Sequence, residues 1–265
     1  MTEALSAPNS PAALRSLIRA GRWLSPTAGL TPGFAQANLV VLPHAWAYEF
    51  LLFCQRNPKP CPLLEVTDTG NWEPIASAPG ADLRQDLPYY HVYQNGELVE
   101  RRRNILDLWQ GDWVAFLLGC SFTFEEGLLE AGVPVRHIAC GRNVPMYRTT
   151  IGCRPAGRFS GPMVVSMRPI PADLVVRSVQ VTSRYPAVHG APVHIGDPAT
   201  IGIADLMCPD YGDQPDVRPG DVPIFWACGV TPQAVATAAK TDLMVTHAPG
   251  HMFITDIPTA SLAVF

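Results

Sequence analysis

The chain has 265 residues, of which 48% are apolar and only 16% are charged, and its formal net charge at pH 7 is -4. Because 23 acidic residues outnumber 19 basic residues, the composition argues against a protein that binds nucleic acids. The longest nearly apolar stretch, Trp113 to Cys120, is far shorter than the roughly 20 residues that a membrane-spanning helix needs, so no membrane span is expected.

The N-terminal segment and the cysteines favour a reduced, cytoplasmic setting. Residues Met1 to Ser10 contain no basic stretch followed by an apolar core, so no secretory signal is expected. The 7 cysteines are an odd number and include no Cys-x-x-Cys pair, which gives little support to a disulfide framework or a structural zinc site. The high apolar content and the low content of charged residues also favour a homo-oligomer.

The N-terminal half predicts two helices and a hairpin. Proline after Ser10 and a stop at Gly21 are typical of a helix, and Asn95-Gly96 is typical of a tight hairpin turn. In chain order the expected elements are a helix from Pro11 to Ile18, an apolar run over Leu39–Leu42, a helix from Pro43 to Gln55, strands over Pro60–Val66 and Tyr89–Gln94, and a second hairpin strand over Glu97–Val99.

Three later segments share one pattern, in which an apolar run of strand length leads through a turn into a helix. In the first, the run Trp113–Cys120 precedes a cap at Thr123 and a helix to about Ala131. In the second, the run Val193–Gly196 precedes a cap at Asp197-Pro198 and a helix to about Met207. In the third, the run Val222–Cys228 precedes a cap at Thr231-Pro232 and a helix to about Lys240. Glu126 completes a T-x-x-E capping box in the first of them. A reactive side chain stands three residues before each cap, namely Cys120, His194 and Cys228.

The stretch Val133–Pro192 is rich in β-branched residues and turns, and it predicts strands most clearly over Met163–Met167 and Val175–Thr182. Strands mixed with helices indicate a mixed α/β fold with a β-rich middle and repeated strand-turn-helix units. We expect one compact domain of two intertwined halves, residues 1–112 and 113–265, of which the second carries most candidate site residues. In open α/β sheets, ligands bind at the carboxyl ends of the strands.

Polar residues with few other charges around them form a first group of candidate site residues. Arg142, Asn143 and Arg148 flank an apolar Val-Pro-Met segment, and guanidinium groups bind carboxylates in a bidentate manner. These residues would suit a small acidic substrate, although loop arginines are also typical of a solvated surface. Ser160 in a Ser-Gly-Pro turn and Tyr211 in an Asp-Tyr-Gly-Asp turn are further candidates for substrate binding.

Histidines and cysteines form a second group. His189 and His194, and likewise His247 and His251, lie in loops broken by proline and glycine, which argues against the helical spacing of a metal-binding pair. We therefore expect no metal, and either general acid–base catalysis or a structural hydrogen bond for each histidine. Cys228 is expected either as a nucleophile favoured by a helix N-terminus or as a small core residue.

Long linked strings in the sequence resemble one known family. They are Gln36–Val40 (QANLV), Asn57–Glu65 (NPKPCPLLE), Gly119–Glu126 (GCSFTFEE), Gly141–Thr149 (GRNVPMYRT), Phe159–Pro169 (FSGPMVVSMRP), Ser183–Asp197 (SRYPAVHGAPVHIGD), Pro209–Asp213 (PDYGD), Val222–Gln233 (VPIFWACGVTPQ) and Thr246–Asp256 (THAPGHMFITD). Together they resemble the bacterial hydro-lyase family now called the D-glutamate cyclase family, and the likeness covers about residues 10 to 258.

The resemblance implies an enzyme that removes water from a small carboxylic acid without a cofactor, and for D-glutamate this means ring closure to 5-oxo-D-proline. Such chemistry needs a base for the amine, an acid for the departing oxygen, donors for the oxyanion and a cation for the carboxylate. The candidates are His189, His194 and His247 as base and acid with Cys228 as a further catalytic residue, backbone N–H groups near Ser121 or Gly229 as oxyanion donors, and Arg142, Arg148 or Arg184 as the cation. A β-elimination would need the same base and acid. A non-catalytic carboxylate-binding or regulatory protein and a metal-dependent lyase that uses the histidine loops remain as alternatives.

Overall fold

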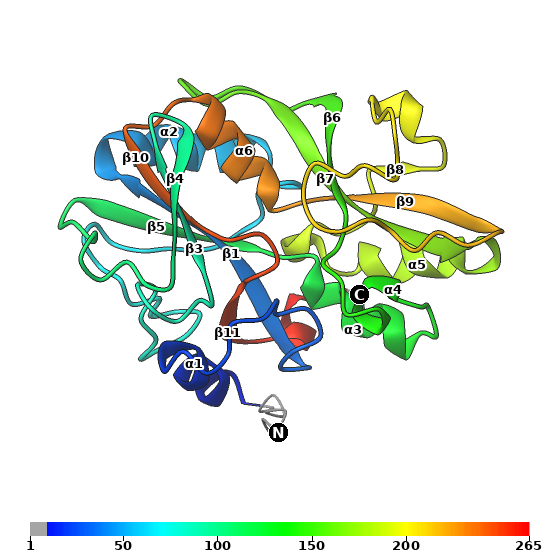
Figure 1. The fold of residues 1–265 in the computed structure, drawn as a ribbon, viewed down its shortest axis with the longest axis horizontal. Coiled ribbons are helices and arrows are strands. Elements are labelled where there is room, and N and C mark those ends of the chain that lie inside the picture. Colours follow the sequence, from blue (N-terminus) through cyan, green and yellow to red (C-terminus); the bar gives the residue numbers. More distant parts are fainter. Residues whose placement is uncertain (1–9, 265) are drawn as a thin grey trace.

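The computed structural model describes residues 10–264 as two antiparallel sheets with helices around them (Figure 1). The seven strands of the larger sheet are β1 (Phe34–Pro43), β2 (Leu63–Val66), β3 (Tyr90–Gln94), β4 (Glu97–Arg102), β5 (Trp113–Gly119), β10 (Leu243–His247) and β11 (Phe253–Pro258). Their order is β2-β5-β1-β10-β3-β4, and β11 also pairs with β1. Both halves of the chain therefore contribute strands to this sheet.

The smaller sheet has four strands in the order β6-β7-β9-β8. They are β6 (Met146–Gly152), β7 (Pro162–Pro171), β8 (His194–Ile195) and β9 (Asp221–Ala227). All ladders of both sheets are antiparallel within residues 10–264. Neighbouring strands therefore end at opposite edges, and the expected shared carboxyl edge of an open parallel sheet is not present in the described chain.

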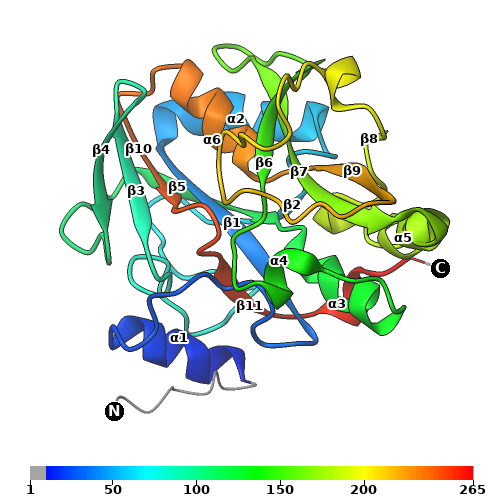
Figure 2. The same cartoon turned by 45° about the vertical axis from the view of Figure 1, so that its right-hand side comes forward.

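Helices cover the sheets and fill the space between them (Figure 2). They are α1 (Pro11–Arg19), α2 (His44–Arg56), α3 (Phe122–Glu130), α4 (Arg136–Ala139), α5 (Val175–Ser183) and α6 (Val230–Ala238), with short 3-10 helices at Ala172–Leu174, Pro186–Val188, Pro198–Ile201 and Thr259–Leu262. Helix α6 contacts both β1 and β7, so it lies between the two sheets, and α3 packs against α5. No helix within residues 10–264 has the length and apolar character needed to cross a membrane.

Strand β1 forms the centre of the larger sheet, because its eight inner residues are all buried. Val40 and Leu42 pack with Phe50 of α2 on one face, whereas Leu39 and Val41 pack in a second apolar cluster on the other face. The run Leu39–Leu42 is apolar at every position, as expected where a strand is buried on both faces, whereas Gln36 and Asn38 are polar residues in the same buried strand. The predicted mixed α/β fold is confirmed, as are the first helix and the hairpin of β3 and β4.

Two predicted elements are wrong. Residues Val175–Ser183 form helix α5 where a strand is expected, because apolar side chains recur at helical spacing and Val175 and Val181 reach the same core cluster. The hydroxyl of Thr182 also accepts a hydrogen bond from the indole of Trp226 at 3.1 Å. Asp197-Pro198 opens only a 3-10 helix that ends at Ile201, since Gly202 follows in a left-handed conformation with φ 81°.

Candidate functional site

Two turns that lead from a strand into a helix have the same hydrogen-bonding pattern. The first joins β5 to α3 at Cys120, and the second joins β9 to α6 at Cys228. The N–H of Cys120 donates to the carbonyl of Gln36 on β1 at 3.1 Å, and the N–H of Cys228 donates to the carbonyl of Val164 on β7 at 3.0 Å. Each cysteine is thereby held against a neighbouring strand of its own sheet.

The threonine three residues after each cysteine completes this pattern. The hydroxyl of Thr123 accepts from the N–H of Gln36 at 3.1 Å, and that of Thr231 accepts from the N–H of Val164 at 3.0 Å. Both threonines lie in the first turn of their helices, so the prediction that they are N-caps is wrong. Each hydroxyl instead satisfies a buried strand amide that would otherwise lack a partner.

The two turns line one small cavity, which we call the inter-helix cavity. Its lining residues are Asn38, Cys120, Ser121, Phe122, Val144, Met146, Cys228, Val230, His247, Gly250 and Met252. Gly229 packs so closely on Asn38 that a Cβ there would overlap the amide side chain. The backbone of the second turn therefore comes as near to β1 as a residue without a side chain allows.

Backbone donors of both turns are left unpaired. Within residues 10–264, the N–H groups of Ser121 and Gly229 have no hydrogen-bond partner. These residues precede the nine-residue helices α3 and α6, and the first N–H groups of a helix have no partner inside the helix itself. The partial positive charge of a helix N-terminus makes such a position favourable for an anion.

His247 adds a ring nitrogen to the cavity. Its Nδ1 lies 3.2 Å from the backbone nitrogen of Leu39. The same Nδ1 lies 3.3 Å from the carbonyl of Leu39, so it accepts from Leu39 in one tautomer of the neutral ring and donates to Leu39 in the other. In the first tautomer the proton is on Nε2, which has no partner among the described residues. Burial lowers the pKa of His247 to about 4, so the ring is neutral at pH 7, and with Nδ1 as the acceptor its Nε2 offers an N–H group to the cavity.

A buried ion-pair network supports the first turn from behind. The guanidinium of Arg168 donates to Glu125 Oε1 from Nε at 2.9 Å and to the Ser121 hydroxyl from Nη2 at 3.1 Å. His137 Nε2 lies 3.0 Å from the same carboxylate oxygen. Burial raises the pKa of Glu125, but His137 and Arg168 outweigh it and hold this pKa below its usual value. Since the Ser121 oxygen accepts from Arg168, its hydroxyl proton is free to donate elsewhere.

Sequence reasoning did not select Arg168, Asn38 or Glu125 for the site. Arg168 lies within the apolar strand β7, and a charged residue that is 1% exposed inside such a strand requires a buried partner. This isolated charge in an apolar run is the signal that would have identified the network. Asn38 has the same signature, because it is a polar residue within the buried strand β1.

Four of the predicted residues lie in or beside the inter-helix cavity. Cys228 and His247 line it. Asn143 lies beside the cavity. Its Nδ2 donates to the carbonyl of Pro249 at 3.4 Å. Its side chain is also so close to the lining residue Gly250 that a Cβ on Gly250 would overlap it. Tyr211 packs against the apolar cluster that contains both cysteines of the turns.

The other predicted residues do not line this cavity. Arg148 is linked to Tyr211, because its Nη2 donates to the hydroxyl of Tyr211 at 2.8 Å. Arg142 donates to the carbonyl of Gln214 at 3.2 Å, while Ser160 and Arg184 are exposed. The expectation of one hollow shared by both groups of residues is therefore met only in part.

The two histidines of the loop 189–194 have separate surroundings. His189 is buried, its Nδ1 lies 2.9 Å from the carbonyl of Lys59, and it lines a different pocket. His194 Nε2 lies 2.8 Å from the carbonyl of Asp197 and 3.0 Å from the hydroxyl of Thr200. Among residues 10–264, no group of three or more His, Cys, Asp or Glu side chains has an arrangement suited to a metal ion.

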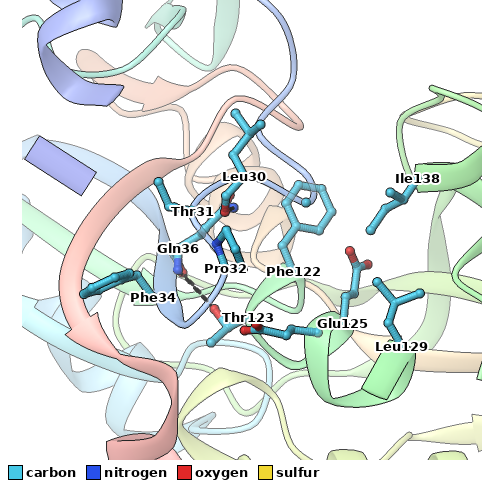
Figure 3. Close-up of a pocket in the computed structure, with 12 residues that line it drawn as sticks. Leu30, Thr31, Pro32, Phe34, Gln36, Phe122, Thr123, Glu125, Leu129 and Ile138 are labelled. Carbon is cyan, nitrogen blue, oxygen red and sulfur yellow. Dashed lines mark hydrogen bonds between the residues drawn. The ribbon is translucent and has the colours of Figure 1, made fainter. Parts of the chain in front are cut away.

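A second, larger cavity shares Phe122 with the inter-helix cavity (Figure 3). Its walls are largely apolar, and three of its buried oxygens have no partner among the described residues, those of Thr31 (Oγ1), Gln36 (Oε1) and Glu125 (Oε2). Glu126, predicted to close the capping box, also lines it and accepts the N–H of Gly33 at 2.6 Å. Unpaired carbonyl and carboxylate oxygens suit a ligand that donates hydrogen bonds, so this cavity is a poor site for an acid.

Comparisons with known proteins place this chain among its relatives. A family model described as D-glutamate cyclase matches residues 114–256, which include both turns and His247. Proteins named "Putative hydro-lyase" from Geobacillus kaustophilus and Stutzerimonas stutzeri are each 64% identical to this chain, over 98% and 96% of both sequences respectively. A crystal structure of a nitrogen repressor-like protein from Methanococcus jannaschii, 12% identical, covers 91% of this chain and 96% of its own with a TM-score of 0.39, too low to support an argument.

Proposed function

Because the chain belongs to the D-glutamate cyclase family, we propose that it is a hydro-lyase that removes water from a small carboxylic acid held in the inter-helix cavity. The reaction that we favour is ring closure of D-glutamate to 5-oxo-D-proline and water. The supporting observation is that Ser121, with its unpaired N–H, and His247, whose Nε2 has no partner, both line this cavity, and that the unpaired N–H of Gly229 lies in the chain between the lining residues Cys228 and Val230. Donors without acceptors suit both a carboxylate and the tetrahedral oxyanion that forms during ring closure.

The N-termini of α3 and α6 supply the positive potential for binding the acid. Both helices begin at the cavity, so the partial charges at their ends add. The charge of Arg168 contributes little to this potential, because Glu125 neutralises it. Arg168 contributes mainly through its hydrogen bond to the Ser121 hydroxyl. That bond orients the Ser121 hydroxyl as a fourth donor toward a bound carboxylate.

Ring closure requires a proton to leave the α-ammonium before nitrogen attacks the γ-carboxyl carbon, and the departing oxygen must leave as water. We assign the N–H groups of Ser121 and Gly229 to the oxyanion and the His247 Nε2–H to the departing oxygen. Burial raises the pKa of Cys228 to about 11, so its thiol keeps a proton at pH 7. This thiol is the proposed relay between amine and departing oxygen.

The free state of all seven cysteines supports a reducing, cytoplasmic setting.

Proton NMR of D-glutamate incubated with the purified protein tests this proposal. The wild-type protein should form 5-oxo-D-proline, and His247→Ala should lose about 100-fold to 1000-fold of the rate, since removal of one preorganised hydrogen-bond donor to developing charge costs roughly 10²–10³-fold. His44→Ala, at the exposed first residue of α2, is the matched control and should retain the rate. Stoichiometric binding of D-glutamate without product would instead favour the carboxylate-binding alternative and contradict the proposal.

A further inference from the structure

The second cavity contains buried oxygen atoms to which no group of the described chain donates a hydrogen bond. Thr31 of the loop before β1, Gln36 of β1 and Glu125 of α3 line it, and these residues are 1%, 3% and 1% exposed (Figure 3). Within residues 10–264, Thr31 Oγ1, Gln36 Oε1 and Glu125 Oε2 have no hydrogen-bond partner. Such atoms destabilise the folded chain unless a water or a ligand donates to them, so their presence in one cavity indicates an occupant.

The orientation of the Gln36 amide is fixed by its other hydrogen bonds. Its Nε2 donates to the carbonyl of Thr27 at 2.8 Å and to that of Leu30 at 3.3 Å. Backbone carbonyls only accept, so the amide nitrogen faces them and Oε1 is the atom left without a partner. Because Thr31 follows Leu30 directly, the Thr31 hydroxyl lies on the same side of the cavity as the Gln36 amide, as Figure 3 shows.

Negative charge lies on this side of the cavity as well. Glu126 lines the cavity, and its Oε2 accepts the N–H of Gly33, two residues after Thr31, at 2.6 Å. Arg168 neutralises Glu125, whereas no ion pair within residues 10–264 neutralises Glu126. No Lys, Arg or His is among the described residues that line the cavity. The unpaired acceptors are thus combined with an uncompensated carboxylate, which favours a ligand that is both a donor and a cation.

The cavity has room for a small molecule and is open to solvent. On the measure by which one water needs roughly 10–15 Å³, its volume is about 90 Å³. Gly29, Pro32 and Leu129 line it and are exposed, so a ligand can enter between them. Its apolar side chains are those of Leu30, Pro32, Phe34, Phe122, Leu129 and Ile138.

We propose that the second cavity binds a primary ammonium group carried on a short apolar carbon chain. The ammonium donates hydrogen bonds to Gln36 Oε1 and Thr31 Oγ1, and the carboxylate of Glu126 supplies the countercharge. The carbon chain packs against the apolar side chains of the cavity. This inference goes beyond the proposed function, because it concerns a different cavity and a ligand of opposite charge to the acid.

Titration of the ¹⁵N-labelled protein with n-propylammonium, followed by NMR, tests the inference. The amide signals of Thr31, Gly33 and Gln36 should shift and saturate, with a Kd of roughly 0.1–10 mM for so small a ligand. Propionate and n-propanol have the same carbon chain, and they should shift these signals at least about 10-fold more weakly, since neither carries a cationic donor.

Thr31→Val removes the proposed hydrogen bond without removing one that the free protein uses. Valine has the same β-branched shape, so the backbone at φ 45° is strained equally in both, and the urea midpoint of the free variant should not fall. Its Kd for n-propylammonium should rise by about 10-fold to 100-fold, because a hydrogen bond from a charged donor is lost. Thr69→Val, at an exposed position, is the matched control and should bind as the wild type does.

The carboxylate is tested by Glu126→Gln, which keeps an acceptor for the N–H of Gly33 and removes the charge. The preference of this variant for n-propylammonium over n-propanol should be smaller than that of the wild type.

Three results would overturn the inference. Signals that do not saturate with n-propylammonium would mean that the cavity holds water only. Equal binding of n-propanol or propionate would contradict an ammonium ligand. An unchanged Kd in Thr31→Val would show that its hydroxyl does not contact the ligand. Each of these results leaves the proposed ring closure intact, because that reaction is measured separately and concerns the inter-helix cavity.

Discussion

Cys120 and Cys228 occupy equivalent positions in two turns that come from different sheets and open into one cavity. The equivalence extends to the threonine that follows each by three residues and to the strand residue with which that threonine bonds. Such repetition places two helix N-termini at one point without parallel strands. The site therefore depends on how each turn is fastened to its neighbouring strand.

The hydrogen bond between each threonine and its neighbouring strand can be tested by removing one hydroxyl. Thr231→Val keeps the shape of the side chain and leaves the N–H of Val164 buried without a partner, because that N–H donates to Thr231 Oγ1 at 3.0 Å. We expect the free energy of unfolding to fall by about 1–3 kcal/mol in urea titrations. Thr69→Val, at an exposed position, should change it by less than about 0.5 kcal/mol. Equal stabilities of the two variants would contradict this role.

The buried carboxylate of Glu125 holds the ion-pair network together. In Glu125→Gln the guanidinium of Arg168, which is 1% exposed, would lose its countercharge. Breaking a buried ion pair on one side costs roughly 3–5 kcal/mol, and we expect a loss of this size in denaturant unfolding at pH 7. Glu130→Gln, at the exposed end of α3, is the matched control. An unchanged unfolding midpoint in Glu125→Gln would contradict the network's role.

Acid should weaken the protein through His247. Its pKa falls from 6.5 to about 4 on burial, so between these values the unfolded chain binds a proton that the folded chain does not. Stability therefore decreases as the pH falls from 6.5 to 4, by up to about 3 kcal/mol from this group. In His247→Asn this part of the pH dependence should disappear from unfolding curves measured at pH 4.5, 5.5 and 7.

His44→Asn, at an exposed position, serves as the control for the acid effect and should keep the wild-type slope of stability against pH. Burial lowers the pKa of His189 to about 4 as well, so a residual slope of the same sign is expected in His247→Asn. A slope identical to that of the wild type would show that His247 does not change its protonation on unfolding.

Local patterns were the reliable part of the sequence. The apolar runs before Cys120 and Cys228 and the helices after them were predictable, because a strand, a tight turn and a helix start each depend on neighbouring residues. The bond between His247 and Leu39 joins residues that are 208 apart, and that between Arg168 and Glu125 joins residues that are 43 apart. Strand pairing decides such contacts, and a single sequence does not reveal it.

For the loop 189–194 the prediction failed for the opposite reason. His189 and His194 are close in the sequence, and they were therefore predicted to share one site. His189 has a left-handed backbone with φ 82°, and its ring turns toward the carbonyl of Lys59. His194 belongs to β8 and packs on Phe225 of β9. A change of backbone direction at His189 and Gly190, both with positive φ, separates side chains that the sequence alone placed together.

The contact between Gly229 and Asn38 offers a test of how closely the second turn must approach β1. Gly229 has a φ of -66°, which any residue adopts, so Gly229→Ala is opposed only by the overlap of its Cβ with the Asn38 side chain. We expect a loss of about 1–3 kcal/mol in unfolding free energy from overpacking, together with a lower rate because the Gly229 N–H moves. Gly111→Ala, which meets open space, should leave both unchanged.

A second substitution separates the steric cause from any other. If overlap with Asn38 is the reason for the loss, the double variant Asn38→Ala/Gly229→Ala should be less destabilised than the sum of the two single variants, with a coupling of about 0.5–3 kcal/mol. Asn38→Ala alone should also weaken the protein, since its Nδ2 donates to the carbonyl of Gly119 at 2.9 Å in the first turn. Additive losses would mean that Asn38 does not set the position of the second turn, and the two turns would then be independent of each other.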